Sequence, residues 1–407
     1  MSEAAPFTVD LDRAVGALAD ALDLIGVDEV GHGHRVAWMA ATVAARLGWA
    51  AAERRELLRA ALLHDCGVSS TREHKHLVNE LDWEGAQAHC ERGAAYLAEV
   101  PPLAHLAPVV REHHTHWPDL LHRGVPEAVA LPANLIFLAD RADTLRARGF
   151  AAGQPVVEIL VGHGPTHFAP ALLDAFGEAA EPEAFWFAQE GCGLGRCLDE
   201  LVAGGSHVVL DLGAIRALAT MFGRIIDAKS PYTERHSLGV ARLARWLGAQ
   251  FGLPPIRLDM LEVAGLLHDL GKLRLPDDIL EKPGPLSPAE RQLVARHAFD
   301  TWQVMTKAFG DGPIVQWAAL HHEAMSGHGY PFHRNGDQLP LEARIVAVAD
   351  VFQALAQDRP YRAAQLPEEI LPILDGMVFG GRLDRVVVDA VHADPAAAWR
   401  EATGAER

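Results

Sequence analysis

The chain has 407 residues, which is enough for two or three domains with a hydrophobic core each. Hydrophobic residues make up 49% of it; alanine and leucine are frequent and β-branched runs are short, so the composition favours helices over sheet. The formal net charge of -18 argues against nonspecific binding to a nucleic acid polymer, although local cations or metal ions can still accommodate a small anionic substrate.

The lack of an apolar membrane segment and of a signal peptide predicts a cytoplasmic protein. No run of 18 apolar residues is present, so we expect no transmembrane helix and no membrane partner. The segment 1–6 lacks the basic end and apolar stretch of a signal peptide. In a reducing compartment Cys66, Cys90, Cys192 and Cys197 are expected to be free thiols, since Cys192 and Cys197 alone do not complete a tetrahedral zinc site.

The first 150 residues read as a series of helices. Residues 10–26 have the pattern of an amphipathic helix, and a further helical pattern ends at Leu47-Gly48. Apolar residues at helical spacing then lead to the pair His64-Asp65. Gly67 follows two positions later, where a helix is expected to stop.

Residues 151–205 separate two similar halves of the chain. Glycine and proline are frequent there, so we predict a loop-rich region with helices only near 169–178 and 183–189. The stretch Gly191–Gly205 is predicted to be the linker itself.

The second half repeats the first. Residues 211–226 match the opening helix of residues 10–26, and a second helical pattern ends at Leu247-Gly248. The helix that follows leads to His268-Asp269, with Gly271 two positions later. The chain therefore contains an internal duplication.

Histidines and aspartates recur in one order in both halves. The C-terminal set is His236, His268, Asp269, His297, His321, His322 and Asp350. The N-terminal set is His34, His64, Asp65, His89, His113, His114 and Asp140. The third element and the paired histidines are 24 residues apart in both copies. A lone histidine is more often a packed or surface residue than a ligand, but a repeated set of seven favours a metal centre in each half.

Five imidazoles and two carboxylates are a suitable donor set for two divalent ions. Nitrogen and carboxylate oxygen suit iron, manganese, zinc or nickel better than calcium or magnesium. An aspartate beside a ligating histidine, as in His268-Asp269, can reach the second ion. Two such ions activate water and offset charge on phosphoryl oxygens, so the pattern predicts hydrolysis at phosphorus.

Further motifs in the second half resemble the HD-GYP family. They are His268-Asp-Leu-Gly-Lys272, Lys282-Pro-Gly-Pro-Leu286, Tyr232-Thr-Glu-Arg-His-Ser237, His321-His-Glu323, Gly329-Tyr-Pro331, Val348-Ala-Asp-Val-Phe352 and Asp358-Arg-Pro-Tyr-Arg362. The match runs in family order over about residues 211–390. The family comprises all-helical, metal-dependent phosphodiesterases that open cyclic di-GMP or, in some members, cyclic GMP-AMP.

This resemblance implies a role for each matching residue. One metal would be held by His236, His268, Asp269 and Asp350, and the other by Asp269, His297, His321 and His322, with Asp269 bridging. Lys272 would contact the scissile phosphate and help protonate the leaving oxygen, so Asp269 and Lys272 are the expected catalytic residues. The expected substrate-binding residues are Gly329, Tyr330, Pro331, Arg359 and Arg362.

The second copy departs from the family pattern at three positions. Ser230 stands six residues before His236 and Gln353 three after Asp350, where family members often carry aspartates. Tyr232 occupies the position of the glutamate found in three-metal members, so the resemblance implies two metals per site, iron or manganese first and zinc or nickel as alternatives.

The first copy resembles the broader HD superfamily more than HD-GYP proteins. It has Asp28 and Asp143, but Val68 stands at the position of Lys272, and it has no Gly-Tyr-Pro motif. The positions of Arg359 and Arg362 correspond to Gly149 and Ala152. We expect it to bind metal and to have a regulatory or dimer-forming role rather than independent catalysis.

The expected fold is all-α, with two tandem HD-type helical bundles. The predicted segments are a divergent HD domain at 8–150, a helical extension and linker at 151–205, and an HD-GYP domain at 206–407. The expected activity is hydrolysis of a cyclic dinucleotide, cyclic di-GMP first and cyclic GMP-AMP second. Two alternatives are a cyclic dinucleotide receptor without turnover and a nucleotidase that works through its N-terminal domain. A homodimer is the partner considered besides the substrate.

Overall fold

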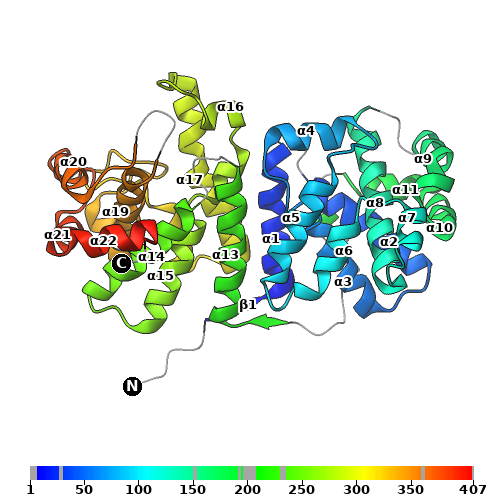
Figure 1. The fold of residues 1–407 in the computed structure, drawn as a ribbon, viewed down its shortest axis with the longest axis horizontal. Coiled ribbons are helices and arrows are strands. Elements are labelled where there is room, and N and C mark those ends of the chain that lie inside the picture. The colour runs from blue at the N-terminus through cyan, green and yellow to red at the C-terminus, as the bar shows by residue number, and fades with distance from the viewer. Residues whose placement is uncertain are drawn as a thin grey trace. The chain divides into compact units, whose positions relative to one another are not determined.

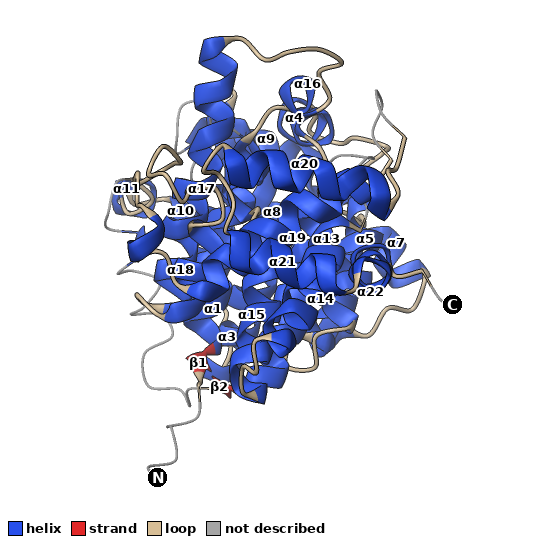
Figure 2. Cartoon of the chain, turned by 90° about the vertical axis from the view of Figure 1, so that its left-hand side faces the viewer, coloured by secondary structure: helices blue, strands red, loops and turns tan. Residues whose placement is uncertain are grey.

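A computed structural model gives the fold, and it describes residues 7–26, 31–149, 154–190, 194–195, 208–229, 235–358 and 363–405. Helices make up nearly all of its regular structure (Figures 1 and 2), so the predicted all-α class is confirmed. The described strands are β1 (Val9–Asp10) and β2 (Val209–Leu210), which pair in a two-stranded sheet. The chain divides into two compact units, one of residues 10–209 and the other of residues 1–9 and 210–407.

The unit of residues 10–209 is built of short helices around a buried core that includes Leu11, Phe137 and Phe176. Its α-helices are α1 (Leu11–Leu22), α2 (His32–Arg46), α3 (Ala51–Leu62), α4 (Thr71–Asn79), α5 (Gln87–Ala98), α6 (Ala107–Glu112), α7 (Trp117–His122), α8 (Glu127–Ala147), α9 (Gln154–His167), α10 (Pro170–Ala180) and α11 (Glu183–Phe187). Its described 3₁₀ helices are η1 (Asp23–Gly26) and η2 (Ala104–Leu106).

The second unit repeats this plan around Phe222, Trp317 and Phe352, all fully buried. Its α-helices are α13 (Leu212–Ala228), α14 (His236–Gln250), α15 (Pro255–Leu267), α16 (Asp277–Leu280), α17 (Pro288–Phe309), α18 (Pro313–Ala319), α19 (Leu341–Ala356), α20 (Pro367–Phe379), α21 (Arg385–Ala393) and α22 (Pro395–Thr403). Its 3₁₀ helices are η3 (Leu270–Arg274) and η4 (Gly336–Gln338).

The two units begin with the same helix start. Asp10 accepts a hydrogen bond from Arg13 N at 3.0 Å ahead of α1, and Asp211 accepts one from Ala214 N at 2.8 Å ahead of α13. An aspartate at this position satisfies a backbone N–H that has no partner inside the helix. Both helices were predicted from their amphipathic pattern, and their positions are confirmed.

The segment between the two halves contains more helix than the sequence indicated. α10 and α11 agree with the predicted stretches near 169–178 and 183–189, but α9 occupies residues predicted to be loop. Pro155 stands in the first turn of α9, where a missing N–H costs nothing, and Val156 and Leu160 are fully buried. Apolar packing therefore outweighs the weak helix propensity of Gly162 and Gly164. The predicted linker lies outside the described residues except for residues 194–195.

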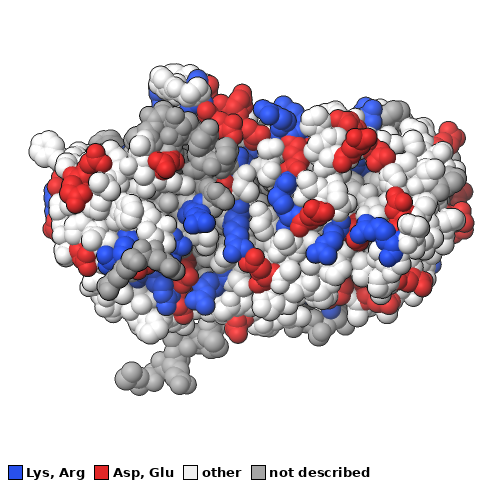
Figure 3. Space-filling view, in the orientation of Figure 1, with Lys and Arg blue, Asp and Glu red and all other residues white. Residues whose placement is uncertain are grey.

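Charge is mixed on the surface. Figure 3 shows lysine and arginine side chains interspersed with aspartate and glutamate on the face drawn. Among the described helices, none combines the length and the apolar character that a membrane span requires. Cys66 and Cys90 are free thiols, as predicted, whereas Cys192 and Cys197 lie outside the described residues.

Candidate metal centres

The seven predicted residues of the second half come together at one buried centre. His236 is the first residue of α14, His268 and Asp269 follow α15, and His297 lies within α17. His321 and His322 follow α18, and Asp350 lies in α19. Five segments that are distant in sequence thus each contribute at least one side chain of metal-ligand type.

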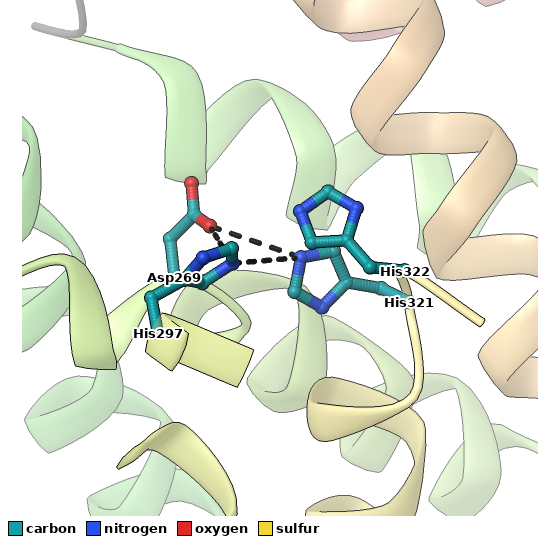
Figure 4. A group of neighbouring side chains, drawn as sticks. All are labelled: Asp269, His297, His321 and His322. Carbon is teal, nitrogen blue, oxygen red and sulfur yellow. Dashed lines mark hydrogen bonds and ion pairs between the residues drawn. The ribbon is translucent and has the colours of Figure 1, made fainter. Parts of the chain in front are cut away.

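Asp269 lies between two groups of these side chains. Its Oδ2 atom is 3.5 Å from His236 Nε2 and 3.2 Å from His268 Nε2. Its Oδ1 atom is 3.4 Å from His297 Nε2 and 3.8 Å from His321 Nε2, as drawn in Figure 4. His322 joins the second group. One carboxylate therefore faces both halves of the centre, which is the arrangement a bridging ligand requires.

The remaining acid, Asp350, belongs to the first group. Its Oδ1 atom is 3.3 Å from His236 Nε2 and 3.8 Å from His268 Nε2. Separations of this size between donor atoms suit ions with bond lengths of about 2 Å.

The histidine rings are oriented by hydrogen bonds from their other nitrogen. The Nδ1 atoms of His268, His297 and His321 donate to the backbone carbonyls three residues earlier, at 2.8, 2.6 and 2.6 Å. Because a carbonyl only accepts, Nδ1 carries a proton, which leaves Nε2 as the nitrogen that can bind a metal, as in metal-ligating histidines. The buried atoms His236 Nε2, His268 Nε2 and Asp269 Oδ1 have no hydrogen-bond partner. Such orphaned atoms, converging on one point, fit divalent cations.

Electrostatics also favour a cation at this centre. Burial lowers the pKa of His297 to about 4 and that of His321 to about 3, so both rings are neutral near pH 7, the form that binds metal. Burial alone would lower the pKa of His268 too, but the charge of Asp269 raises it to about 10. The carboxylates of Asp269 and Asp350 therefore stabilise a positive charge beside them, which a proton or a metal ion can supply.

A glycine lets the His268-Asp269 turn lie directly on α17. A Cβ atom at Gly271 would be 2.1 Å from the carbonyl oxygen of His297. Gly271 N donates to Thr301 Oγ1 at 2.9 Å, and Thr301 Oγ1 donates to the carbonyl of His268 at 3.1 Å. Gly271 was predicted as a helix stop, but α15 already ends at Leu267. Close backbone approach is therefore the reason that glycine is needed here.

Gln353 orients the remaining histidine. Its Oε1 atom accepts a hydrogen bond from His236 Nδ1 at 2.5 Å. The same interaction in the first unit comes from Asp143, whose Oδ2 is 2.8 Å from His32 Nδ1. Gln353 thus keeps the hydrogen bond of the carboxylate often found at this position and lacks only its charge.

Removing this amide is expected to weaken metal binding. We predict that Gln353→Ala lowers metal affinity by about 10- to 100-fold, because His236 loses the partner that fixes its ring. Isothermal titration with Mn²⁺ measures the change. Gln316→Ala, on exposed surface of α18, serves as the control, and equal affinities in the two variants would contradict the prediction.

Two other predicted features lie beside the centre. Lys272 Nζ is 2.5 Å from Asp269 Oδ2, with about a quarter of its side chain exposed. In the Gly329-Tyr330-Pro331 motif, the centroid of the Tyr330 ring lies 4.8 Å from that of the His322 ring. Glu323, which sequence reasoning gave no role, is buried and accepts hydrogen bonds from Phe332 N and Arg334 N, so it holds this loop. Arg359 and Arg362, like Ser230, Tyr232 and Asp28, lie outside the described residues.

The first unit has a similar centre, but the histidine at its first position is His32 rather than the predicted His34. His32 Nε2 is 3.5 Å from Asp140 and 3.8 Å from Asp65, whereas the His34 ring faces Asp20 and Asp23. His32 is the first residue of α2, as His236 is of α14. Two positions further along a helix, a side chain points to a different face. The spacing carried the signal, since His32 and His64 are as far apart as His236 and His268.

The other six predicted residues of the first unit do meet. Asp65 Oδ2 is 3.5 Å from His64 Nε2, and its Oδ1 is 3.3 Å from His89 Nε2 and 4.0 Å from His113 Nε2. His114 Nε2 is 3.6 Å from Asp140. The place of Lys272 is taken by Val68, which is buried. This centre therefore has the ligand types of the second one without its exposed cation.

Comparison with known proteins agrees with this duplicated plan. Sequence families described as HD domains match residues 30–145 and residues 220–387. A solved structure of a cyclic GMP-AMP specific phosphodiesterase from Vibrio cholerae, V-cGAP3, superposes over 95% of this chain and 97% of its own, with a TM-score of 0.67 and 26% identity. The fold and the two centres thus define a protein with two HD domains in tandem.

Individual relatives place it more closely. The chain is 35% identical to 3'3'-cGAMP-specific phosphodiesterase 1 of Vibrio cholerae over 95% of its own length and 92% of the relative's. It is also 35% identical to the cyclic di-GMP phosphodiesterase response regulator RpfG of Xanthomonas campestris, over 39% of this chain and 43% of that one. The chain belongs to the HD-GYP family of phosphodiesterases.

Proposed function

We propose that this protein hydrolyses a phosphodiester bond of a cyclic dinucleotide at the centre of its second HD domain. The observation that carries this proposal is the convergence of six ligand-type side chains around Asp269, with the buried Nε2 atoms of His236 and His268 left without hydrogen-bond partners and Lys272 alongside. The activities named for the relatives support the same class of substrate. Metal ions that activate water, together with a nearby proton donor, are an effective combination for phosphodiester hydrolysis.

Two divalent ions are the cofactor that these residues fit. One would be held by His236, His268, Asp269 and Asp350, and the other by Asp269, His297, His321 and His322. Bound ions would supply an activated water molecule and offset the charge of the phosphoryl oxygens. The mixture of nitrogen and oxygen donors favours iron or manganese, with zinc and nickel as the alternatives.

Residues of the chain itself would position the substrate and move a proton. Lys272 is the cation nearest the bridging acid, so it would contact the scissile phosphate and give a proton to the leaving oxygen. Tyr330 packs on His322 and would form one wall beside the reacting phosphate. Burial of the histidines keeps bulk water from the ligand atoms, which strengthens each electrostatic contact.

Loss of the Lys272 side chain is expected to lower the rate of the chemical step without reducing the amount of bound metal. We predict that Lys272→Met lowers kcat by about 10²- to 10³-fold, the usual contribution of a positioned proton donor, with unchanged metal content. Steady-state kinetics and metal analysis measure the two effects. Lys307→Met, an exposed lysine of α17, is the control. A kcat equal to that of the unaltered protein would remove Lys272 from the mechanism.

Cyclic GMP-AMP and cyclic di-GMP are both candidate substrates. The motifs of the second half resemble those of enzymes that act on cyclic di-GMP, so the sequence alone predicted cyclic di-GMP as the first candidate. The relative that matches nearly the whole chain is named for 3'3'-cGAMP, whereas RpfG, named for cyclic di-GMP, matches 39% of it. The full-length match raises cyclic GMP-AMP to an equal candidate.

One experiment separates these substrates and the remaining alternatives. The protein is incubated with each dinucleotide and Mn²⁺ or Fe²⁺, and products are resolved by chromatography. We expect turnover that is lost in the double variant His268→Ala/Asp269→Ala. Tight binding without product would instead identify a receptor. Turnover lost only in His64→Ala/Asp65→Ala would assign the chemistry to the first domain and overturn the proposal.

The first HD domain would serve regulation or stability rather than turnover. Val68 in place of Lys272 leaves its centre without the proton donor proposed for the second one. A metal ion bound there would stabilise the helices around it, because formation of the site and local folding are linked.

A further inference from the structure

A cysteine, Cys90, lies beside two of the histidines at the centre of the first HD domain. Cys90 follows His89 in α5 and is fully buried. Its Sγ atom is 3.8 Å from His89 Nε2 and 3.9 Å from His113 Nε2. The corresponding residue after His297 in the second domain is Ala298, which offers no ligand atom. The two centres therefore differ in donor chemistry at a position where their geometry is alike.

Three of these atoms, His89 Nε2, Cys90 Sγ and His113 Nε2, lie close enough together to bind one ion, and the carboxylate of Asp65 faces the two imidazoles. His89 Nε2 and His113 Nε2 are 3.1 Å apart, and Asp65 Oδ1 is 3.3 Å from the first and 4.0 Å from the second. Zinc bonds of about 2.0 Å to nitrogen or oxygen and about 2.3 Å to sulfur place tetrahedral ligand atoms about 3.3–3.7 Å apart. Two imidazoles, one carboxylate and one thiolate would fill such a coordination sphere.

The other half of the same centre already holds a fixed cation. Arg141 is almost fully buried, and its Nη2 atom donates to Asp140 Oδ2 at 2.7 Å. Its Nη1 atom is held by the carbonyls of Leu77, Glu80 and Leu81. Asp350, the counterpart of Asp140, is followed by Val351, so the second domain has no cation at the position of Arg141. A buried guanidinium on Asp140 opposes a second metal ion there by like-charge repulsion.

We propose that the first HD domain binds a single zinc ion through His89, Cys90 and His113, with the carboxylate of Asp65 turning toward the ion as the fourth ligand, in a closed site that lacks a position for water. This inference rests on the proposed metal binding of the first domain and specifies it. Thiolate sulfur favours zinc over iron(II) or manganese, and four protein ligands are typical of structural zinc sites. The thiol proton of Cys90 would pass to solvent as the ion binds. Duplication of one fold has then produced a structural centre and a catalytic one.

Cobalt substitution tests this directly in the full-length protein. A thiolate bound to Co²⁺ gives a near-ultraviolet charge-transfer absorption band that histidine and carboxylate ligands do not give. Titration with Co²⁺ of the metal-depleted His268→Ala/Asp269→Ala variant, in which the second centre is removed, should produce this band and saturate it at one ion per chain. Cys90→Ala and the isosteric Cys90→Ser should lose it. Cys66→Ala is the matched control, because the buried Cys66 Sγ contacts the carbonyl of Gly93 instead, and it should keep the band.

The possible results have distinct meanings. A band that persists in both Cys90 variants overturns the thiolate ligand, while metal binding by the first domain stands. Cobalt analysis of His268→Ala/Asp269→Ala, which removes the second centre, should find one ion; two ions would overturn the single-ion site. No cobalt in that variant would overturn the metal role of the first domain altogether. Turnover of the unaltered protein tests the second domain separately, so its proposed function can fail or stand independently.

Discussion

Replacing Asp269 with asparagine is expected to lower turnover by at least about 10³-fold, the largest effect of any single substitution at the centre. The side chain keeps its shape but loses the charge that faces His236 and His268 on one side and His297 and His321 on the other. Metal-based stabilisation of the transition state is worth several kcal/mol, and each 1.36 kcal/mol is a factor of ten in rate. Loss of this carboxylate would therefore weaken binding of both proposed ions at once.

Two measurements are needed for this prediction. Product formation from the preferred dinucleotide gives the rate, and metal analysis of the purified variant should show that the second domain no longer retains its ions. Asp311→Asn, on the exposed turn after α17, is the control for loss of an acidic charge. Asp65→Asn makes the same change in the first domain. If Asp65→Asn abolished turnover and Asp269→Asn did not, the assignment of the two domains would be reversed.

Much of this site could be predicted because it depends on the types of residue present and on their order in the sequence. Imidazoles and carboxylates that recur in two copies predict a metal centre without knowledge of the fold, and the seven residues of the second copy do converge. The same reasoning misplaced one ligand in the first copy. His32 and His34 are both histidines near a helix start. The spacing to His64, equal to that between His236 and His268, indicates His32, and the helix turns His34 toward a different face.

Other features could not be predicted because they depend on contacts between distant segments. Nothing in the local sequence around Arg141 shows that its guanidinium binds three carbonyls some 60 residues earlier. Helix α9 forms despite its glycine and proline residues because Val156 and Leu160 are buried in the core. The local pattern alone predicted Gly271 to end a helix. The structure shows that glycine is required because the backbone of α17 leaves no room for a Cβ atom there.

This close approach makes Gly271→Ala the second substitution with a large expected effect. An added Cβ atom would be 2.1 Å from the carbonyl oxygen of His297, so either the His268-Asp269 turn or α17 must move. Overpacking of this kind costs about 1–3 kcal/mol, a fall of several degrees in Tm. A shift of about 1 Å in catalytic groups can cost about 100-fold in rate, so turnover should fall together with stability.

The duplicated fold supplies the controls for this prediction. Gly67→Ala creates the same clash in the first domain, where the Cβ atom would be 1.9 Å from the carbonyl oxygen of His89. It should lower thermal stability by a similar amount while turnover in the second domain continues. Gly376→Ala, on the exposed side of α20 with no atom within 4 Å of the new Cβ, should instead stabilise the protein by about 0.5–1 kcal/mol. Calorimetry and dinucleotide turnover on the three variants check this. Full activity and an unchanged Tm in Gly271→Ala would mean that the turn can move away from α17 without disturbing Asp269, and close packing would then not be what positions the bridging acid.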